Sequence, residues 1–381
     1  MTDTSRHVET IRLGVIGTGL AVEKLHWPAL KRLRDRFQVT AFADTNRASA
    51  EHFAAYSGTS MDGFVEDYHD LLRRDDVDAV LISLPIPLNY PVTRETLEAG
   101  KHVICEKPTG ANADEATAFA EMQDEFPDRT MLIAENWFYR DDLRLARSLL
   151  DDGLIGRMHL VSWRSVSQLV PREGEFSSTP WRQHAEYVGG PHLDGGVHNI
   201  AQIRLLCGDA ARIVGETQDA NGLFAGPSDL SLTIRFVSGA VGNLTVAHPE
   251  LAVPDEPNDM RLYGTEGVMS VGREGTRIFW PDGRVERWKV DQADAGYYNE
   301  FLNFHEALNG DAPLIGTIAQ SARNMEWITR GITSAERGQV MKMSPRPTTL
   351  SANAVPLWRP AGADGLFDGL DVNVQHDKDI S

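Results

Sequence analysis

The stretch GVIGTGLAVEKLHWPAL, residues 14–30, decides the fold, because Gly17-Thr18-Gly19 follows an apolar strand and precedes a helix. Gly17 permits a tight turn and Gly19 lets the backbone approach a pyrophosphate, while the free N–H groups of the following helix favour a negative charge. Val22 replaces the third glycine of the full dinucleotide fingerprint. The stretch predicts a dinucleotide site whose contacts are Gly17, Thr18, Gly19, Leu20 and Ala21.

A second polar position supports this site. Asp44 ends the apolar run VTAFAD roughly 25 positions after Gly19, close to the spacing of an acid that binds ribose hydroxyls. An ionised Asp44 would repel a 2'-phosphate, which favours NAD over NADP, although Arg47 could soften that repulsion. The alternative role of Asp44 is to cap the next helix only. NADP is not excluded as the cofactor.

The first third of the chain alternates short apolar runs with helix-like segments from Ile11 to about Ile133. Parallel strands need crossover connections, and each crossover helix covers one face of the sheet. We therefore predict an α/β architecture whose N-terminal domain, residues 8–136, is a Rossmann domain with a doubly wound parallel sheet.

The pattern changes after a helix-like segment at 141–153. Apolar and polar positions then alternate, which is typical of antiparallel strands, at 157–170, 231–249, 260–272 and 277–290. Helical spacing returns at 297–310 and 318–338. We predict an α+β domain over residues 137–343 with a large open antiparallel sheet, followed by an extended C-terminal tail over residues 344–381.

Composition restricts the partners. The 381 residues carry 37 basic and 55 acidic side chains, a formal net charge of -18, which opposes binding to nucleic acid and to anionic lipid. Cys105 and Cys207 are the two cysteines, and they lie too far apart for a CxxC motif or a disulfide framework. No signal peptide or membrane-spanning stretch is recognisable. We expect a cytoplasmic protein with no nucleic-acid or membrane partner.

Three further residues suggest a reacting centre. Asp194 and His198 stand four residues apart before a helical apolar pattern, so on an α-helix the carboxylate would share a face with the imidazole. Lys107 follows an apolar run in VICEKPTG. Together they could take a proton from an alcohol while a nicotinamide takes the hydride.

Less specific interpretations exist for each of these residues. Lys107 could be a solvated charge at a strand end, and His198 could be an ordinary helix residue. His192, Asp194 and His198 could instead bind a metal, but no fourth ligand stands nearby. We expect no metal.

The motifs GVIGTG, AGKHVICEKP and GGPHLDGGVH occur in this order, and alternating strands follow them. That arrangement resembles the glucose-fructose oxidoreductase and inositol dehydrogenase (Gfo/Idh/MocA) family over about Ile11 to Gly338. The resemblance implies an NAD(P)-dependent oxidoreductase of sugars, cyclitols or related polyols. It also implies a homodimer or homotetramer that associates through the open antiparallel sheet.

The resemblance assigns roles residue by residue. It makes Lys107 the catalytic lysine beside the nicotinamide, with Glu106 supporting the turn, and counts both residues among the cofactor contacts. It also implies a cis Lys107–Pro108 bond. Asp194 and His198 would contact the substrate and assist proton transfer. The segments ENWFYR and TPWRQ resemble pocket-lining segments, which makes Asn136 a cofactor contact, Tyr139 and Arg140 substrate contacts, and Trp181 and Arg182 contacts of either. Surface packing is the alternative for Trp181 and Arg182.

One segment departs from the family pattern. Where many members have TPNxxH, this chain reads LPIPLNY, so Leu84, Ile86 and Asn89 replace Thr, Asn and His. Those positions normally offer polar contacts near the nicotinamide ribose. We still expect this loop to line the cofactor through Ser83, Leu84, Pro85 and Asn89.

These predictions favour reversible oxidation of a secondary hydroxyl, or reduction of the matching ketone, on a sugar, cyclitol or polyol. An alternative is a glycosidase or epimerase that oxidises a sugar transiently and recycles its NAD. A third is an NAD-binding regulator without activity, although such a protein has no chemical need for Lys107, Asp194 and His198 together.

Overall fold

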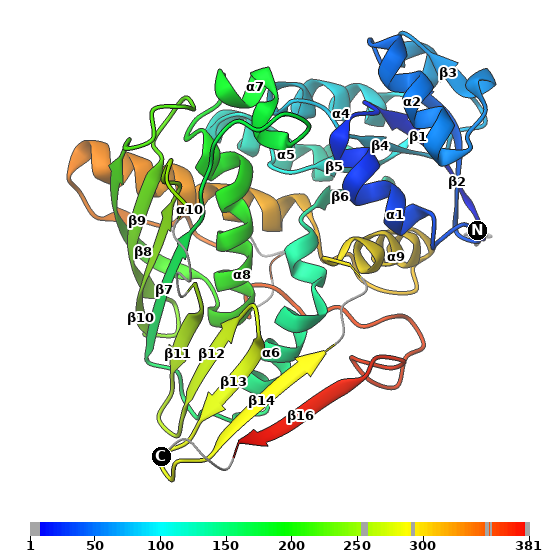
Figure 1. Cartoon of the computed structure of the whole chain (residues 1–381). Coiled ribbons are helices and arrows are strands. Elements are labelled where there is room, and N and C mark those ends of the chain that lie inside the picture. The colour runs from blue at the N-terminus through cyan, green and yellow to red at the C-terminus, as the bar shows by residue number, and fades with distance from the viewer. Residues whose placement is uncertain (1–7, 253–257, 291–293, 347–349, 351–352, 378–381) are drawn as a thin grey trace. The chain divides into compact units, whose positions relative to one another are not determined.

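The computed structural model describes residues 8–252, 258–290, 294–346, 350 and 353–377, which form two compact units (Figure 1). The first unit comprises the chain up to Asn136 together with Gly296–Ala322 and Pro360–Gly362. The second comprises Trp137–Ala295, Arg323–Arg359 and the chain from Ala363. The predicted domains follow the order of the chain, whereas the first unit also includes two later segments.

The first unit is built on a six-stranded parallel sheet, which confirms the predicted Rossmann architecture. Its strand order is β3-β2-β1-β4-β5-β6, so the chain winds outward in both directions from the β1–β4 pair. The strands are β1 (Ile11–Ile16), β2 (Phe37–Ala43), β3 (Phe64–Val65), β4 (Ala79–Ile82), β5 (His102–Glu106) and β6 (Met131–Ala134). Ligands of such sheets bind at the carboxyl ends of the central strands.

Helices cover both faces of this sheet. One face packs against α3 (Tyr68–Leu72), α4 (Asn89–Glu98) and α5 (Ala113–Glu125), and buries side chains that include Val92, Phe119 and Met122. The other face packs against α1 (Trp27–Leu30), α2 (Arg47–Ser57) and α9 (Tyr297–Asn309). On that face the Phe42 ring lies 5.0 Å from Phe53 of α2, and Phe37 lies 5.6 Å from Phe301 of α9.

The helix that the sequence predicts directly after the glycine loop is not a regular α-helix. A π-helical turn, η1 (Val22–His26), precedes the short α1, and Pro28 stands at the start of α1, where its missing N–H costs no hydrogen bond. A π-turn accommodates one more residue than an α-turn, and such turns occur often at functional sites. Hydrophobic spacing predicts the helix but not this change in its pitch.

The second unit contains a ten-stranded sheet of order β15-β8-β9-β10-β7-β11-β12-β13-β14-β16. Its central strands are β7 (Leu160–Val166), β8 (Ala210–Gln218), β9 (Asp229–Phe236), β10 (Val241–Ala247) and β11 (Met260–Tyr263). The sheet continues through β12 (Val268–Gly272), β13 (Gly275–Phe279) and β14 (Val285–Val290). The edges are β15 (Met341–Lys342) and β16 (Val372–Asp377).

The prediction of an antiparallel sheet is confirmed for every pair except one. β7 and β10 run parallel, with Leu160–Val166 beside Val241–Ala247. The segment between β7 and β8 carries the chain to a position three strands away, beside β15, and the β8–β9–β10 meander then returns to β7. Alternating hydrophobicity shows which face is buried but not the direction of a strand.

The sequence prediction missed β8 because one of its buried positions is a glycine. A Cβ on Gly215 would lie 2.1 Å from the carbonyl oxygen of Gly331, so the strand lies directly against α10 (Ile318–Arg337). The predicted tail also contributes to the sheet, since β16 pairs antiparallel with β14. Small buried residues and a single edge strand both give weak periodic signals.

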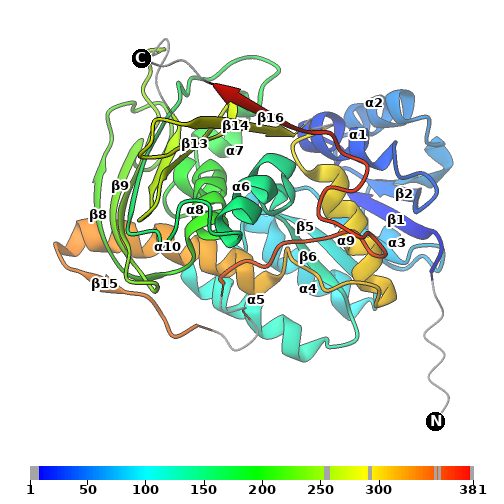
Figure 2. The ribbon, with the colours of Figure 1, turned by 90° about the horizontal axis from the view of Figure 1, so that it is seen from below.

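Helices α6 (Asp141–Asp151), α8 (Val197–Cys207) and α10 cover one face of this sheet (Figure 2). The opposite face of β8–β10 carries mostly polar side chains, such as Ser231 bonded to Thr245 at 2.9 Å, with Val214 and Val241 exposed among them. Among the described residues, no helix has the length and apolar character needed to cross a membrane.

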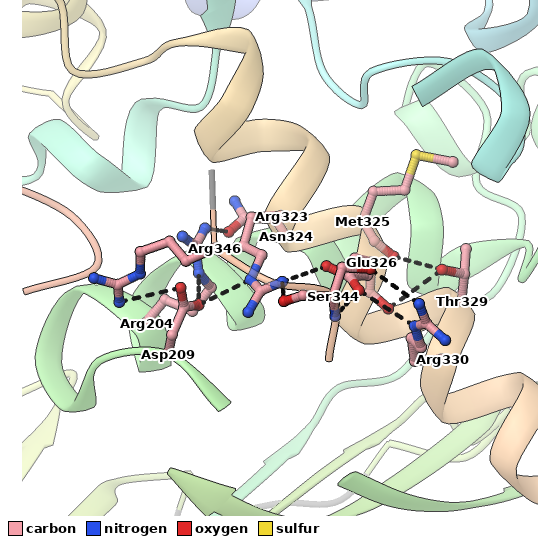
Figure 3. A network of polar contacts seen from close by, with 10 residues as sticks. All are labelled: Arg204, Asp209, Arg323, Asn324, Met325, Glu326, Thr329, Arg330, Ser344 and Arg346. Atoms are coloured by element: carbon pink, nitrogen blue, oxygen red, sulfur yellow. Dashed lines mark hydrogen bonds and ion pairs between the residues drawn. The ribbon is translucent and has the colours of Figure 1, made fainter. Parts of the chain in front are cut away.

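A buried carboxylate ties the end of α8 to α10 and to the segment after β15 (Figure 3). The Asp209 side chain is fully buried and lies 2.9 Å from Arg204, 3.4 Å from Arg323 and 3.3 Å from Arg346. Burial alone would raise the pKa of Asp209, but the three guanidinium groups lower it overall. Glu326 extends the network, since its carboxylate lies 2.6 Å from Arg323. It also accepts a hydrogen bond from the backbone N–H of Ser344 at 2.7 Å.

Replacing Asp209 with Asn should destabilise the protein strongly, because three guanidinium groups would lose their buried counter-charge. We expect a loss of about 3–5 kcal/mol in the free energy of unfolding, measured by urea denaturation at pH 7. The lowered pKa means that the charge of Asp209 stabilises the fold at neutral pH and that this contribution is lost as the pH falls through the folded-state pKa.

The difference between wild type and D209N should therefore shrink below about pH 4, where the carboxylate also protonates in the unfolded chain. Asp151→Asn is the matched control, since Asp151 pairs with Arg147 but its side chain is 49% exposed. That variant should unfold at nearly the wild-type urea concentration. Equal stabilities for D209N and D151N would contradict the role given to the buried network.

Candidate functional site

The glycine loop at the end of β1 is tightly packed at Gly17 and exposed at Gly19. Gly17 has a φ of +85°, and a Cβ there would lie 2.3 Å from the carbonyl oxygen of Ser83 and 2.9 Å from the Leu84 side chain. No side chain larger than hydrogen fits that position. Gly19 is exposed, and no atom lies within 4 Å of where its Cβ would be, so its backbone is free to contact a ligand.

Asp44 connects this loop to the end of β2. Its Oδ2 accepts hydrogen bonds from the backbone N–H and the hydroxyl of Thr18, both at 2.8 Å, and its Oδ1 accepts one from the Asn46 N–H at 2.8 Å. The N-cap of α2 is Asn46, which accepts from the Ala48 N–H, so the interpretation of Asp44 as the helix cap is wrong. Arg47 is exposed, with its Nε 3.0 Å from Glu51.

The open backbone at Gly19 and the carboxylate at the end of β2 together fit a dinucleotide with a ribose diol. Leu20 and Ala21 lead directly from this backbone into η1. Ser83 and Leu84 lie against Gly17, and Pro85 follows them at the end of β4. These predicted cofactor contacts therefore gather at the carboxyl ends of β1, β2 and β4.

Asn89 has a different position from the other predicted contacts. Its side chain is fully buried, and its Nδ2 donates to the carbonyl oxygens of Glu106 at 2.9 Å and Pro108 at 3.2 Å. Asn89 thus holds the main chain on both sides of Lys107. The departure LPIPLNY replaces a polar ligand contact with a support for the neighbouring turn.

Lys107 follows the last residue of β5, and the Lys107–Pro108 bond is cis, as the family resemblance implies. Lys107 is partly exposed. The side chain of the preceding residue, Glu106, contacts His26, with Oε1 2.7 Å from Nε2. His26 gave no sequence signal of its own, because its partner lies on a different strand.

In the second unit, Asp194 belongs to a π-helical turn, η6 (His192–Gly196), and His198 to the first turn of α8. The expected α-helical spacing of the two residues therefore does not apply across this turn. Asp194 Oδ2 accepts a hydrogen bond from Arg182 Nε at 2.6 Å, and both side chains are mostly buried. The Arg182 guanidinium also lies 4.0 Å over the Trp181 ring.

His198 stacks on an aromatic side chain that sequence analysis missed. The rings of His198 and Trp137 lie 5.4 Å apart with an interplanar angle of 10°. The Arg140 guanidinium lies 4.6 Å over the same Trp137 ring and pairs with Asp142 at 2.7 Å. Trp137 lies within the segment ENWFYR, so the sequence alone could have selected it as a site residue.

Two other predicted contacts of that segment are buried. Asn136 is 2% exposed, and Tyr139 is fully buried with its ring 6.2 Å from Trp358. Tyr139 therefore contributes to the core of the second unit in this structure.

His192 is buried as well, and burial, followed by the nearby His248, lowers the pKa of His192 to about 3. His192 is therefore neutral at physiological pH. Among the described residues, no three His, Cys, Asp or Glu side chains are grouped so as to hold a metal ion.

Comparison with known proteins assigns two parts of the chain to one family. Residues 11–132 match the profile of an oxidoreductase family with an NAD-binding Rossmann fold, GFO/IDH/MocA, and residues 143–270 match the C-terminal domain of the same family. A solved oxidoreductase structure from Thermotoga maritima is 30% identical, with a TM-score of 0.79 over 87% of this chain and 98% of that one.

Two relatives are named for reactions of a sugar nucleotide and of a sugar. The dTDP-3,4-didehydro-2,6-dideoxy-alpha-D-glucose 3-reductase of Streptomyces violaceoruber is 30% identical over 74% of this chain and 82% of its own. The NADP-dependent D-xylose 1-dehydrogenase of Haloarcula marismortui is 30% identical over 51% of this chain and 54% of its own. This chain belongs to the GFO/IDH/MocA family and is an NAD(P)-dependent dehydrogenase or reductase acting on CH–OH groups.

Proposed function

We propose that the enzyme reversibly oxidises a secondary hydroxyl of a sugar, cyclitol or related polyol. The observation that carries this proposal is the Lys107 turn, which Asn89 and Glu106 support in the same unit as the glycine loop. The relatives that reduce a deoxysugar nucleotide and oxidise xylose support a carbohydrate-like substrate.

In the proposed mechanism, bound NAD supplies the acceptor for the hydride. The His198 imidazole takes the proton of the substrate hydroxyl in the oxidation direction, and the Lys107 Nζ donates a hydrogen bond to the same oxygen. Asp194 binds the substrate while Arg182 balances its charge. Stacking on Trp137 restricts rotation of the imidazole, so that its nitrogen keeps a fixed direction.

Asp44 supports NAD as the cofactor. Its carboxylate lies at the end of β2, where a 2'-phosphate would meet a like charge. Arg47, the residue that could soften this repulsion, is beside Glu51. The xylose dehydrogenase relative is named for NADP, so cofactor preference differs within the family.

We also propose a cytoplasmic location and a homo-oligomer. Both cysteines are buried free thiols, which suits a reducing compartment. The outward face of β8–β10, with Val214 and Val241 among hydroxyl and amide groups, is the proposed contact between copies in a homodimer or homotetramer.

Replacing Asp44 with Asn should reduce the preference for NAD. Loss of the charge weakens the bonds to ribose hydroxyls and removes the repulsion of a 2'-phosphate, so the ratio of kcat/KM for NADP to that for NAD should rise about tenfold or more. Steady-state kinetics with both cofactors measures this ratio. Asp62→Asn, at an exposed acid of the same unit, is the control, and an unchanged ratio in D44N would contradict the assignment.

Replacing Lys107 with Met should lower kcat by about 10²- to 10⁴-fold while NADH binding, followed by fluorescence, stays within a few-fold of wild type. The assay is a screen of sugars, cyclitols and glycosides with NAD and NADP, and Lys342→Met on exposed β15 is the control. Near-normal turnover in K107M would reject the lysine's role.

The same screen tests the two alternative functions. Release of an aryl group from glycosides without added NAD would indicate the NAD-recycling reaction. A wild-type protein that binds NADH but turns over no compound would indicate a regulator.

Light scattering should show a dimer or tetramer for the wild-type protein. A Val214→Glu/Val241→Glu double variant should shift the mass toward the monomer, because two charges would be buried in the proposed interface. Leu251→Glu, at a position 77% exposed, should leave the mass unchanged. A monomeric wild type would contradict the proposed interface.

A further inference from the structure

A buried histidine lies behind the turn that carries Lys107. His26 is the last residue of η1, its side chain is fully buried, and its Nε2 lies 2.7 Å from Glu106 Oε1. The Glu106 side chain is only 13% exposed. An ionised carboxylate only accepts hydrogen bonds, so the hydrogen in this contact belongs to Nε2 of His26.

The surroundings of the imidazole favour one tautomer. The rings of Tyr297 and Phe301, both from α9, pack edge-on against His26 at 5.6 Å and 5.7 Å. Nδ1 is buried and has no hydrogen-bond partner among the described atoms. The geometry therefore places the hydrogen of the His26–Glu106 contact on Nε2.

Two different residues hold the neighbours of Lys107: Asn89 binds their main chain, and His26 binds the Glu106 side chain. Asn89, the first residue of α4, binds the carbonyl oxygens of Glu106 and Pro108 and so fixes the backbone. His26 binds the Glu106 side chain from η1. Two elements that are distant in the sequence thus converge on the residues that flank Lys107.

The same π-turn is continuous with the glycine loop. The Glu23 N–H donates to the Gly19 carbonyl at 3.2 Å, and His26 ends the turn that begins there. A displacement of the loop would therefore be transmitted through η1 to Glu106. His26 therefore joins the glycine loop, through η1, to the Lys107 turn.

We propose that His26 is a positioning residue for the reaction, acting through Glu106 to hold Lys107 in place relative to the glycine loop. This inference rests on the proposed function, because it requires Lys107 to take part in catalysis. His26 touches neither substrate nor reacting atoms in this proposal.

The test compares His26→Met with His26→Gln. Met has a similar length but no donor, whereas the Gln side-chain amide can place an N–H near the position of the imidazole Nε2. We expect kcat of H26M to fall about tenfold or more, with KM for NAD within about twofold of wild type, and H26Q to recover most of the loss. A His26→Met/Glu106→Gln double variant should be no slower than the slower single variant, because the two side chains act as one unit.

Phe301→Leu is the control for packing. It removes a ring contact of His26 but leaves the Nε2–Oε1 hydrogen bond, so it should lower Tm while kcat stays within twofold of wild type. Nitrogen-15 NMR of the ligand-free protein should show His26 with a hydrogen on Nε2. Equal losses of kcat in H26M and H26Q, in proportion to their losses of Tm, would show a packing role and overturn the inference.

The outcomes separate this inference from the proposed function. Wild-type kcat in H26M, together with an inactive K107M, would overturn the positioning role and leave the proposed reaction intact. A wild type with no turnover across the screen would overturn the proposed reaction, and the inference would fall with it. The NMR readout is independent of turnover, and a His26 Nε2 without hydrogen would overturn the inference by itself.

Discussion

The close approach of Gly17 to the Ser83 carbonyl is the constraint on which the first unit depends. β1 and β4 are neighbours at the centre of the sheet, and a Cβ on Gly17 would come within 2.3 Å of that oxygen. With only hydrogen at this position, the loop closes on the strand ends and leads outward to Gly19. The contact of Asp44 with Thr18 and the course of η1 toward Glu106 both follow from this closure.

The fold was largely predictable because its signals are local. The alternation of apolar strands and amphipathic helices in the first unit needs only neighbouring residues, and it correctly located β1, β2, β4, β5 and β6. The failures have nonlocal causes. Gly215 is buried because α10 lies against it, and β7 is parallel to β10 because of a long crossover. Neither fact leaves a mark in the spacing of hydrophobic residues.

The candidate site shows the same division. Lys107, Asp194 and His198 stand in short motifs, so they could be selected from the sequence. The structure places Lys107 directly after β5, Asp194 within η6 and His198 in the first turn of α8. Their supports could not be selected in this way. His26 meets Glu106 across 80 positions of sequence, and the burial of Asn89 depends on the packing of α4 against β5. Such supports arise from tertiary contacts, which one sequence does not display.

The six residues of β16 have a consequence for association that is separate from the reaction. They pair along the whole of β14, from Val285 to Val290, and so occupy its backbone N–H and C=O groups. Without them β14 would be the edge of a wide sheet and a template for any extended chain. β16 thus takes the place of β14 as the edge of the sheet. The C-terminal segment therefore decides which side chains, among them the exposed Asn373 and Gln375, an extended chain would meet at this edge.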